Sequence, residues 1–223
     1  LNIGYLASTI QHKLRIPREN MLFARKQEEI LSYKPDILAV SSVSQVIGDA
    51  ETVANICKDT LGCLCVLGGY HVSALPHKLP ASFDIGVIGE GENTFSDIVR
   101  QFIDDGHEIT GKLNKFEGIC FHSNGSVVIN HKRRMIDDID SLPHPLRHGD
   151  FAEDAYVFSS RGCPYRCRFC ASCRFWGNIR YHSADYVLEE FRLLTNRYKV
   201  KSIYILDDVF ISDRNRFFSI VEG

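Results

Sequence analysis

The sequence predicts an α/β protein, in which a doubly wound, parallel domain is followed by the first units of a second β/α domain. Two patterns point to this class. Short apolar, β-rich runs alternate with helical stretches up to about Lys115, and the same alternation resumes after Ala152. Hydrophobic residues make up 44% of the 223 residues, which is enough to bury a sizeable core.

Elements of the first domain follow from this alternation. The expected helices cover 1–13, a polar stretch through 28–31, 50–61 and 94–105. The expected buried strands cover 36–42, 63–67 and 85–88. Asn93 is the expected N-cap of the last helix, and Gly106 is its expected end.

A hairpin and a linker come next. Residues 119–122 and 126–129 flank Asn124-Gly125, a strong signal for a two-residue hairpin turn. Residues 131–152 are interpreted as an interdomain linker, because the run over 136–145 is acidic and then proline-bearing. The expected domains are therefore 1–130 and 153–223.

The second domain begins with a strand over 155–160 that leads into a cysteine cluster. A helix over 183–198, with Ser183 as N-cap, precedes a strand over 203–206 and a helix over 213–221. Both ends of the chain look cut, because a strand should precede the first helix and more strands should follow the last one. We therefore expect the amino-terminal portion of a longer protein, which would not turn over substrate alone.

Composition excludes several function classes. The 26 Lys and Arg against 28 Asp and Glu give a net charge of −2, which disfavours a whole-chain grip on nucleic acid. The sequence has no apolar run of the ~20 residues that a membrane span needs. The first residues lack a secretory cleavage pattern, so the expected location is cytoplasmic.

Four of the eight cysteines fall within one short stretch, and this clustering is the strongest chemical signal. Cys163, Cys167 and Cys170 form a C-x3-C-x2-C pattern that follows a strand and precedes a helix. Closely spaced thiolates can wrap an iron–sulfur cluster, and three ligands on a four-iron cube leave one iron open. A structural zinc site that includes Cys173 is the alternative, although such sites usually use two separated cysteine pairs.

The segment from Arg161 to Cys170 resembles the signature of the radical SAM superfamily. The resemblance implies that Cys163, Cys167 and Cys170 hold a 4Fe–4S cluster whose open iron chelates S-adenosylmethionine. Phe169 would then lie by the adenine, and Cys173 would not be a ligand. Asp207 and Asp208 stand where many members carry a Gly-Gly-Glu turn that contacts the methionine amine; this sequence lacks that turn.

The first domain is similar to the cobalamin-binding domain that precedes many radical SAM modules. Small and polar residues follow three successive predicted strands, which leaves a shallow rim where backbone can approach a broad planar ligand. The expected cobalamin-binding residues are Ser41, Ser42, Gly68, Gly69, His71, Glu90 and Gly91. His71 is expected to form the rim without ligating cobalt. The implied fold is a cobalamin-binding-type (flavodoxin-like) domain followed by the start of a partial (β/α) radical SAM barrel.

The resulting hypothesis is a cobalamin-dependent radical SAM enzyme that transfers a methyl group to an unreactive centre. It would need an external electron donor and a small-molecule or peptide substrate. Radical ring formation or oxidation without methylation is an alternative within the same class. An iron–sulfur electron-transfer protein or a corrinoid carrier is the alternative from another class.

Overall fold

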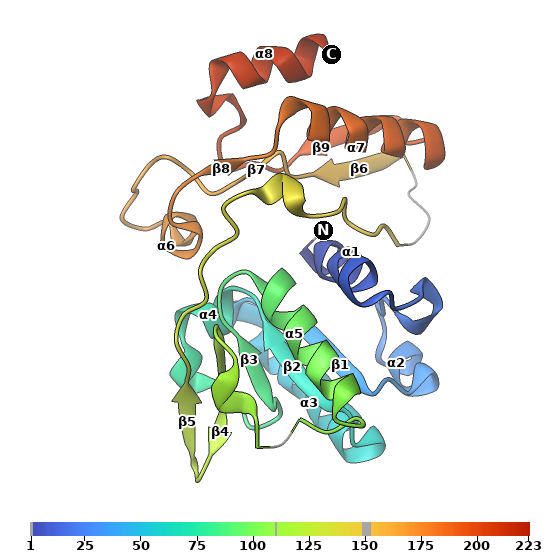
Figure 1. Cartoon of the computed structure of the whole chain (residues 1–223), viewed down its shortest axis with the longest axis vertical. Helices are drawn as coiled ribbons and strands as arrows, with labels where there is room; N and C mark the ends of the chain where they lie inside the picture. The colour runs from blue at the N-terminus through green and yellow to red at the C-terminus, as the bar shows by residue number, and fades with distance from the viewer. Residues whose placement is uncertain (1, 110, 149–152) are drawn as a thin grey trace. The chain divides into compact units, whose positions relative to one another are not determined.

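The computed structural model describes residues 2–109, 111–148 and 153–223, and it divides into two units (Figure 1). We call Thr9–Met135 the amino-terminal unit. Residues 2–8 together with the described part of Ile136–Gly223 form the cysteine-loop unit. The chain is therefore a mixed α/β protein that consists of two units.

A five-stranded sheet forms the centre of the amino-terminal unit, with the strands in chain order. The strands are β1 (Ile37–Ser41), β2 (Leu64–Gly68), β3 (Ile85–Val87), β4 (Ile119–Ser123) and β5 (Ser126–Ile129). The first three are parallel, whereas β4 runs antiparallel to β3 and pairs with β5. The predicted hairpin is confirmed, and it extends the sheet by two strands. The sheet is therefore mixed and not purely parallel.

Helices cover both faces of this sheet (Figure 1). They are α2 (Gln27–Tyr33), α3 (Ile47–Leu61), α4 (Tyr70–Ala74) and α5 (Gly91–Asp104), whereas α1 (Asn2–Leu14) spans the boundary of the two units. Ala54 and Cys57 of α3 pack with Cys65 and Leu67 of β2 in one buried cluster. Each such buried apolar side chain contributes roughly 1–3 kcal/mol to folding.

The start of α5 differs from the expectation. The helix begins at Gly91 with Glu90 at the N-cap position, so the prediction of Asn93 as N-cap is wrong. The side-chain oxygen of Asn93 instead accepts a hydrogen bond from Lys13. Gly106 follows the helix with a φ of 71°, a conformation that glycine adopts without strain.

The cysteine-loop unit contains two parallel strands, β6 (Asp154–Val157) and β9 (Ser202–Ile205), connected through α7 (Ala184–Arg197). Ala155 and Val157 of β6 pack against Leu194 of α7 in its core. Ser183 is the N-cap of α7, because its hydroxyl accepts a 3.1 Å hydrogen bond from the backbone N–H of Tyr186. The remaining elements are β7 (Ser160–Arg161), α6 (Ala171–Trp176), β8 (Arg180–Tyr181) and α8 (Arg214–Glu222).

The segment expected as a linker is partly buried in the cysteine-loop unit. Ile139 is 1% exposed and Leu142 is 4% exposed. These two apolar residues interrupt the acidic run and pack inward, while Asp140 accepts hydrogen bonds from His182 and from the backbone of Ser183. The structure thus groups residues 2–8 and 136–148 with the second unit; residues 149–152 of the expected linker lie outside the described residues.

Short 3₁₀ helices connect these elements: η1 (Arg18–Asn20), η2 (Ser44–Val46), η3 (Pro76–Lys78), η4 (Leu113–Lys115), η5 (Ile139–Ser141) and η6 (Phe210–Ser212). None of the helices in the described ranges is both long and apolar enough to cross a membrane.

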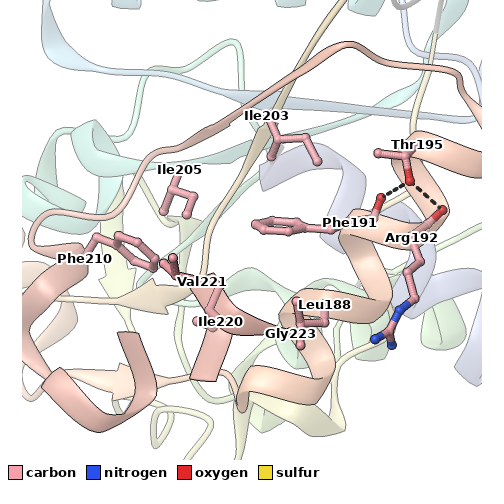
Figure 2. A pocket seen from close by; sticks show the side chains of 10 residues that line it. All are labelled: Leu188, Phe191, Arg192, Thr195, Ile203, Ile205, Phe210, Ile220, Val221 and Gly223. Carbon is pink, nitrogen blue, oxygen red and sulfur yellow. Dashed lines mark hydrogen bonds between the residues drawn. The ribbon is translucent and has the colours of Figure 1, made fainter. Parts of the chain in front are cut away.

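An apolar cavity of about 440 Å³ lies between α7, β9 and α8 (Figure 2). Phe191, Ile205 and Ile220 are among the side chains that line it. The hydroxyl of Thr195 donates to the carbonyl of Phe191 on its own helix, so it adds little polarity to the wall. The lining contains none of the predicted cofactor-binding residues.

Candidate functional site

The predicted cluster ligands lie on an irregular loop between β7 and α6. Cys167 is exposed, and Cys163 and Cys170 are half-buried. Phe169 is 94% exposed and Tyr165 is 63% exposed. The two aromatic rings therefore offer apolar surface beside the thiols that a bound ligand can cover.

Gly162 fixes the start of this loop. Its φ is 92°, a conformation that favours glycine. A Cβ atom built there would lie 3.0 Å from the Cβ of Trp176 and 3.2 Å from the carbonyl oxygen of Asn178. The chain can therefore enter the loop next to the end of α6 only because residue 162 lacks a side chain.

The thiol of Cys173 contacts backbone carbonyl groups, which distinguishes it from the other three cysteines of the cysteine cluster. Its thiol lies 3.3 Å from the carbonyl oxygen of Cys170 and 3.8 Å from that of Cys167, and it can donate to both. The Cys170 N–H also donates to the Cys167 carbonyl at 3.2 Å, which closes a tight turn between two predicted ligands. A thiol that points back at its own backbone is poorly placed to act as a fourth ligand.

The donor set fits an iron–sulfur cluster by its chemistry. Within the described ranges, no three His, Cys, Asp or Glu side chains converge closely enough to hold a metal ion. The three thiols nevertheless share one short loop with accessible sulfur atoms, as cluster assembly from solution requires. Cys163, Cys167 and Cys170 therefore remain the predicted ligands.

Asp207 and Asp208 lie directly after β9, and both carboxylates already accept hydrogen bonds. Asp207 accepts from Ser159 and Ser160, and Asp208 accepts from Ser172 of α6. These three serines were not singled out in the sequence, because a serine next to a predicted strand has no distinctive spacing.

A group of buried polar and aromatic side chains, which includes Arg161 and His182, lies beside the start of the cysteine loop. Arg161 is 6% exposed, and its guanidinium lies 5.5 Å from the ring centre of Trp176 and 5.2 Å from that of Tyr5. The His182 ring is fully buried and stacks on Tyr186 with 4.0 Å between ring centres. Burial lowers the pKa of His182 to about 4, against the opposing effect of its hydrogen bond to Asp140. This group is therefore held by a neutral imidazole at physiological pH.

In the amino-terminal unit, the predicted rim residues lie at the carboxyl ends of β1, β2 and β3. The N–H of Ser42 donates to the carbonyl of Gly68 at 3.0 Å, and the N–H of His71 donates to the carbonyl of Ser42 at 3.1 Å. A Cβ atom on Gly69 would lie 2.7 Å from the Ser42 carbonyl oxygen and 2.8 Å from the Ser41 hydroxyl. The absence of a side chain at residue 69 thus lets the ends of β1 and β2 meet.

Two further residues complete the rim, and sequence reasoning missed both. The hydroxyl of Ser44 lies 2.9 Å from Nδ1 of His71. The hydroxyl of Ser73 accepts a 2.9 Å hydrogen bond from the N–H of Gly89, which joins the end of β3 to α4. Neither serine belongs to a recognisable motif, so only the fold places them here.

The ends of the rim differ in exposure. Glu90 and His71 are each 8% exposed, and Gly91 begins α5. Val43 is 42% exposed and Val46 is 47% exposed on the segment that follows β1. Exposed apolar side chains beside closely approachable backbone suit a broad, partly apolar ligand, and this combination is the feature that fits cobalamin.

The remaining cysteines are structural. Cys57, Cys65 and Cys120 are completely buried, and Cys63 is 5% exposed. Burial raises the pKa of the Cys120 thiol to about 11, and it also raises the pKa values of the other three thiols. Thiols that stay protonated in a packed core are neither ligands nor nucleophiles.

Known proteins with a similar sequence or fold include methyltransferases and a cyclase. No family model matches the sequence. An uncharacterised methyltransferase of Pyrococcus horikoshii is 33% identical over 99% of the chain and 51% of its own length. The anaerobic magnesium-protoporphyrin IX monomethyl ester cyclase of Cereibacter sphaeroides is 25% identical over 87% of the chain and 34% of its own length.

Among solved structures, the fold matches that of TsrM, a radical S-adenosylmethionine methyltransferase from Kitasatospora setae, with cobalamin and a [4Fe-4S] cluster bound. The TM-score is 0.73 at 13% identity, over 99% of this chain and 47% of TsrM. The chain spans about half the length of the P. horikoshii relative and about a third of the cyclase. The chain is therefore similar in sequence to a methyltransferase and a cyclase, and similar in fold to a radical S-adenosylmethionine methyltransferase that binds cobalamin and a [4Fe-4S] cluster.

Proposed function

We propose that this chain holds a [4Fe–4S] cluster through Cys163, Cys167 and Cys170 and uses it to bind and reductively cleave S-adenosylmethionine. The observation that carries the proposal is a three-cysteine loop with accessible thiols, entered through Gly162, whose fourth thiol turns to backbone carbonyls. The cluster, when bound, supplies one electron to S-adenosylmethionine and leaves methionine and a 5′-deoxyadenosyl radical. An external electron donor must then restore that electron.

Phe169 has a defined part in this proposal. Its ring is almost fully exposed on the loop, one residue before a proposed ligand. Stacking against the adenine of S-adenosylmethionine would bury that ring, which makes binding of the nucleoside favourable by roughly 1–3 kcal/mol. Phe169→Ala should therefore weaken S-adenosylmethionine binding and leave the iron content unchanged.

The rim of the amino-terminal unit is proposed to bind cobalamin. Ser41, Ser42, Gly68, Gly69, His71, Glu90 and Gly91 would form the platform. The Nδ1 atom of His71 already contacts the Ser44 hydroxyl, which holds the ring as part of the rim. The sequence contains no Asp-x-His-x-x-Gly string, the loop through which some cobalamin domains ligate cobalt, so cobalt should lack a protein imidazole ligand. Nitrogen splitting from a protein histidine in the electron paramagnetic resonance spectrum of the Co(II) form would contradict this.

With both cofactors, the proposed reaction is methyl transfer to an unreactive carbon or phosphorus centre. The P. horikoshii methyltransferase and TsrM favour this assignment. Ring formation is the second candidate, because the C. sphaeroides relative is a cyclase. The substrate is proposed to be a small molecule or a peptide. Mass spectrometry separates the two reactions, since only methylation adds one carbon from S-adenosylmethionine to the product.

Anaerobic reconstitution with iron and sulfide tests the cluster assignment. We expect about four iron atoms per chain, which Cys163→Ala, Cys167→Ala and Cys170→Ala each abolish. Cys173→Ala is the matched control and should keep the iron. S-adenosylmethionine should change the spectrum of the reduced cluster, because only an open iron can bind it. Equal loss from all four variants, or a spectrum that ignores S-adenosylmethionine, would support a fully ligated electron-transfer cluster instead.

A further inference from the structure

The carboxylate of Asp207 is saturated with hydrogen bonds inside the cysteine-loop unit. One oxygen accepts from the N–H groups of Ser159 at 2.7 Å and Ser160 at 3.0 Å. The other accepts from the hydroxyl groups of the same two serines, at 2.5 Å and 2.7 Å. A carboxylate offers about four acceptor positions, so four donors occupy its capacity.

Ser159 and Ser160 form the base from which the cysteine loop departs. They are 0% and 3% exposed, and they precede Cys163 by only a few residues. The carbonyl of Ser159 also accepts from the His182 N–H at 3.0 Å and from the guanidinium of Arg216. This base is therefore fixed from several directions, and Asp207 supplies the largest share of the hydrogen bonds.

Asp208 holds the other end of the same loop. Its carboxylate accepts a hydrogen bond from the hydroxyl of Ser172, which is 7% exposed in α6. Ser172 lies between Cys170 and Cys173. The two adjacent carboxylates thus connect the end of β9 to the chain just before the first proposed ligand and just after the last one.

We propose that Asp207 and Asp208 are positioning residues that bracket the cysteine loop and hold its three thiols ready for the cluster. This inference rests on the proposal that the three cysteines hold a cluster. It does not depend on which reaction that cluster supports. The loop itself is exposed, so it has few packing contacts that could order it. Fixing both ends reduces the conformational entropy that the loop loses when its thiols converge on one cluster.

The four hydrogen bonds to Asp207 also argue against the role that the resemblance implied for this residue. A methionine ammonium group would need a free acceptor on the carboxylate, and the four serine donors fill those positions on Asp207. Hydrogen bonds to a charged group are among the stronger ones in a protein. Exchanging them for one exposed contact to a ligand would therefore be unfavourable.

Hydrogen exchange of the apo-protein, measured by mass spectrometry, tests the bracket without any cofactor. Asp207→Asn should speed exchange about 10-fold in peptides that cover 159–163, the effect of losing a charged hydrogen bond. Asp208→Asn and Ser172→Ala should each do the same for peptides that cover 170–173. Asp154→Asn, an exposed carboxylate on β6, is the control and should leave both peptides unchanged.

A second measurement follows the cluster after reconstitution. Loss of supporting contacts around metal ligands typically weakens binding 10–100-fold, so a chelator should remove iron from Asp207→Asn and Asp208→Asn about 10-fold faster than from the wild type. The cluster that remains should still respond to S-adenosylmethionine. Unchanged exchange in both aspartate variants overturns the bracket, and so does a full, stable cluster that no longer responds to S-adenosylmethionine.

The two proposals fail in distinguishable ways. If the wild type binds no iron, the cluster assignment fails, while the exchange measurement on apo-protein still decides the bracket. If Asp208→Asn combined with Ser172→Ala speeds exchange no more than either change alone, the two residues act through one hydrogen bond, as the bracket requires. Additive effects would contradict it.

Discussion

The buried imidazole of His182 should make the cysteine-loop unit sensitive to mild acid. Burial lowers its pKa from about 6.5 to about 4. Between these values the unfolded chain binds a proton that the folded chain does not, so the free energy of unfolding falls as the pH falls. A difference of about 2.5 pKa units corresponds to about 3 kcal/mol lost between pH 6.5 and pH 4.

Other groups act in neighbouring pH ranges. Burial alone would raise the pKa of Asp140, but hydrogen bonds from Ser183 and His182 outweigh it and lower that pKa below 3.8. The stability that the ionised Asp140 carboxylate adds to the fold is therefore lost only when the pH falls below about 3.8. Burial raises the pKa of Glu190 above 4.5, against the opposing effect of Arg147. A raised carboxyl pKa makes the folded state hold the extra proton, so its ionisation destabilises the fold as the pH rises. The wild-type curve therefore mixes two opposite slopes.

A variant isolates the histidine. In His182→Asn, the amide can keep the hydrogen bond to Asp140 but cannot titrate, so the pH-dependent loss attributable to His182 should disappear. The difference between wild-type and variant stability should shrink by about 3 kcal/mol from pH 6.5 to pH 4. His77→Asn, at an exposed histidine, should keep the wild-type slope.

The assay is denaturant unfolding monitored by the fluorescence of the single tryptophan, Trp176, at several pH values. This side chain lies in the cysteine-loop unit next to Arg161, so the signal reports that unit. If His182→Asn and the wild type lose stability in parallel across the window, the buried imidazole is not the acid-sensitive group, and the reasoning is refuted.

Two other substitutions test the rim and the core. Gly69→Ala should destabilise the amino-terminal unit by about 1–3 kcal/mol more than Gly89→Ala, because both residues have positive φ but only the first new Cβ would meet the Ser42 carbonyl; equal melting temperatures would contradict this. Arg147→Met should cost about 3–5 kcal/mol, because it leaves the Glu190 carboxylate buried without its partner, and adding Glu190→Leu should recover much of the loss in denaturant titrations.

Sequence reasoning predicted the elements that have a strong local signal. The strands around Ile37 and Leu64, the Asn124-Gly125 hairpin and the Ser183 cap all appear, because periodicity and turn chemistry act over a few residues. The C-x3-C-x2-C loop could also be recognised from the sequence, since its proposed ligands are close together in the chain. Their spacing needs no knowledge of the fold.

The contacts that organise the site could not be predicted in the same way. Asp207 meets Ser159 across 48 positions of the chain, and Asp140 meets His182 across 42. Such pairs depend on tertiary packing between segments far apart in the chain, which no local pattern encodes. The α6 and α4 helices were missed because each is a short turn-length element whose formation depends on tertiary packing.

The proposed iron–sulfur loop and the proposed cobalamin rim share one principle of construction, although each is built within its own unit. In both, a parallel strand ends in residues whose backbone groups are tied to the next strand: Ser42 to Gly68 in one unit, and Ser159 to Asp207 in the other. Val43 beside the rim and Phe169 on the cysteine loop remain exposed beyond these hydrogen-bonded strand ends. A base fixed by hydrogen bonds supports an accessible set of ligand contacts, so the entropic cost of ordering the base is met during folding and not on ligand binding. Substitutions in the base should therefore lower stability and cofactor retention together, whereas substitutions at the exposed positions should lower ligand binding and leave the melting temperature unchanged.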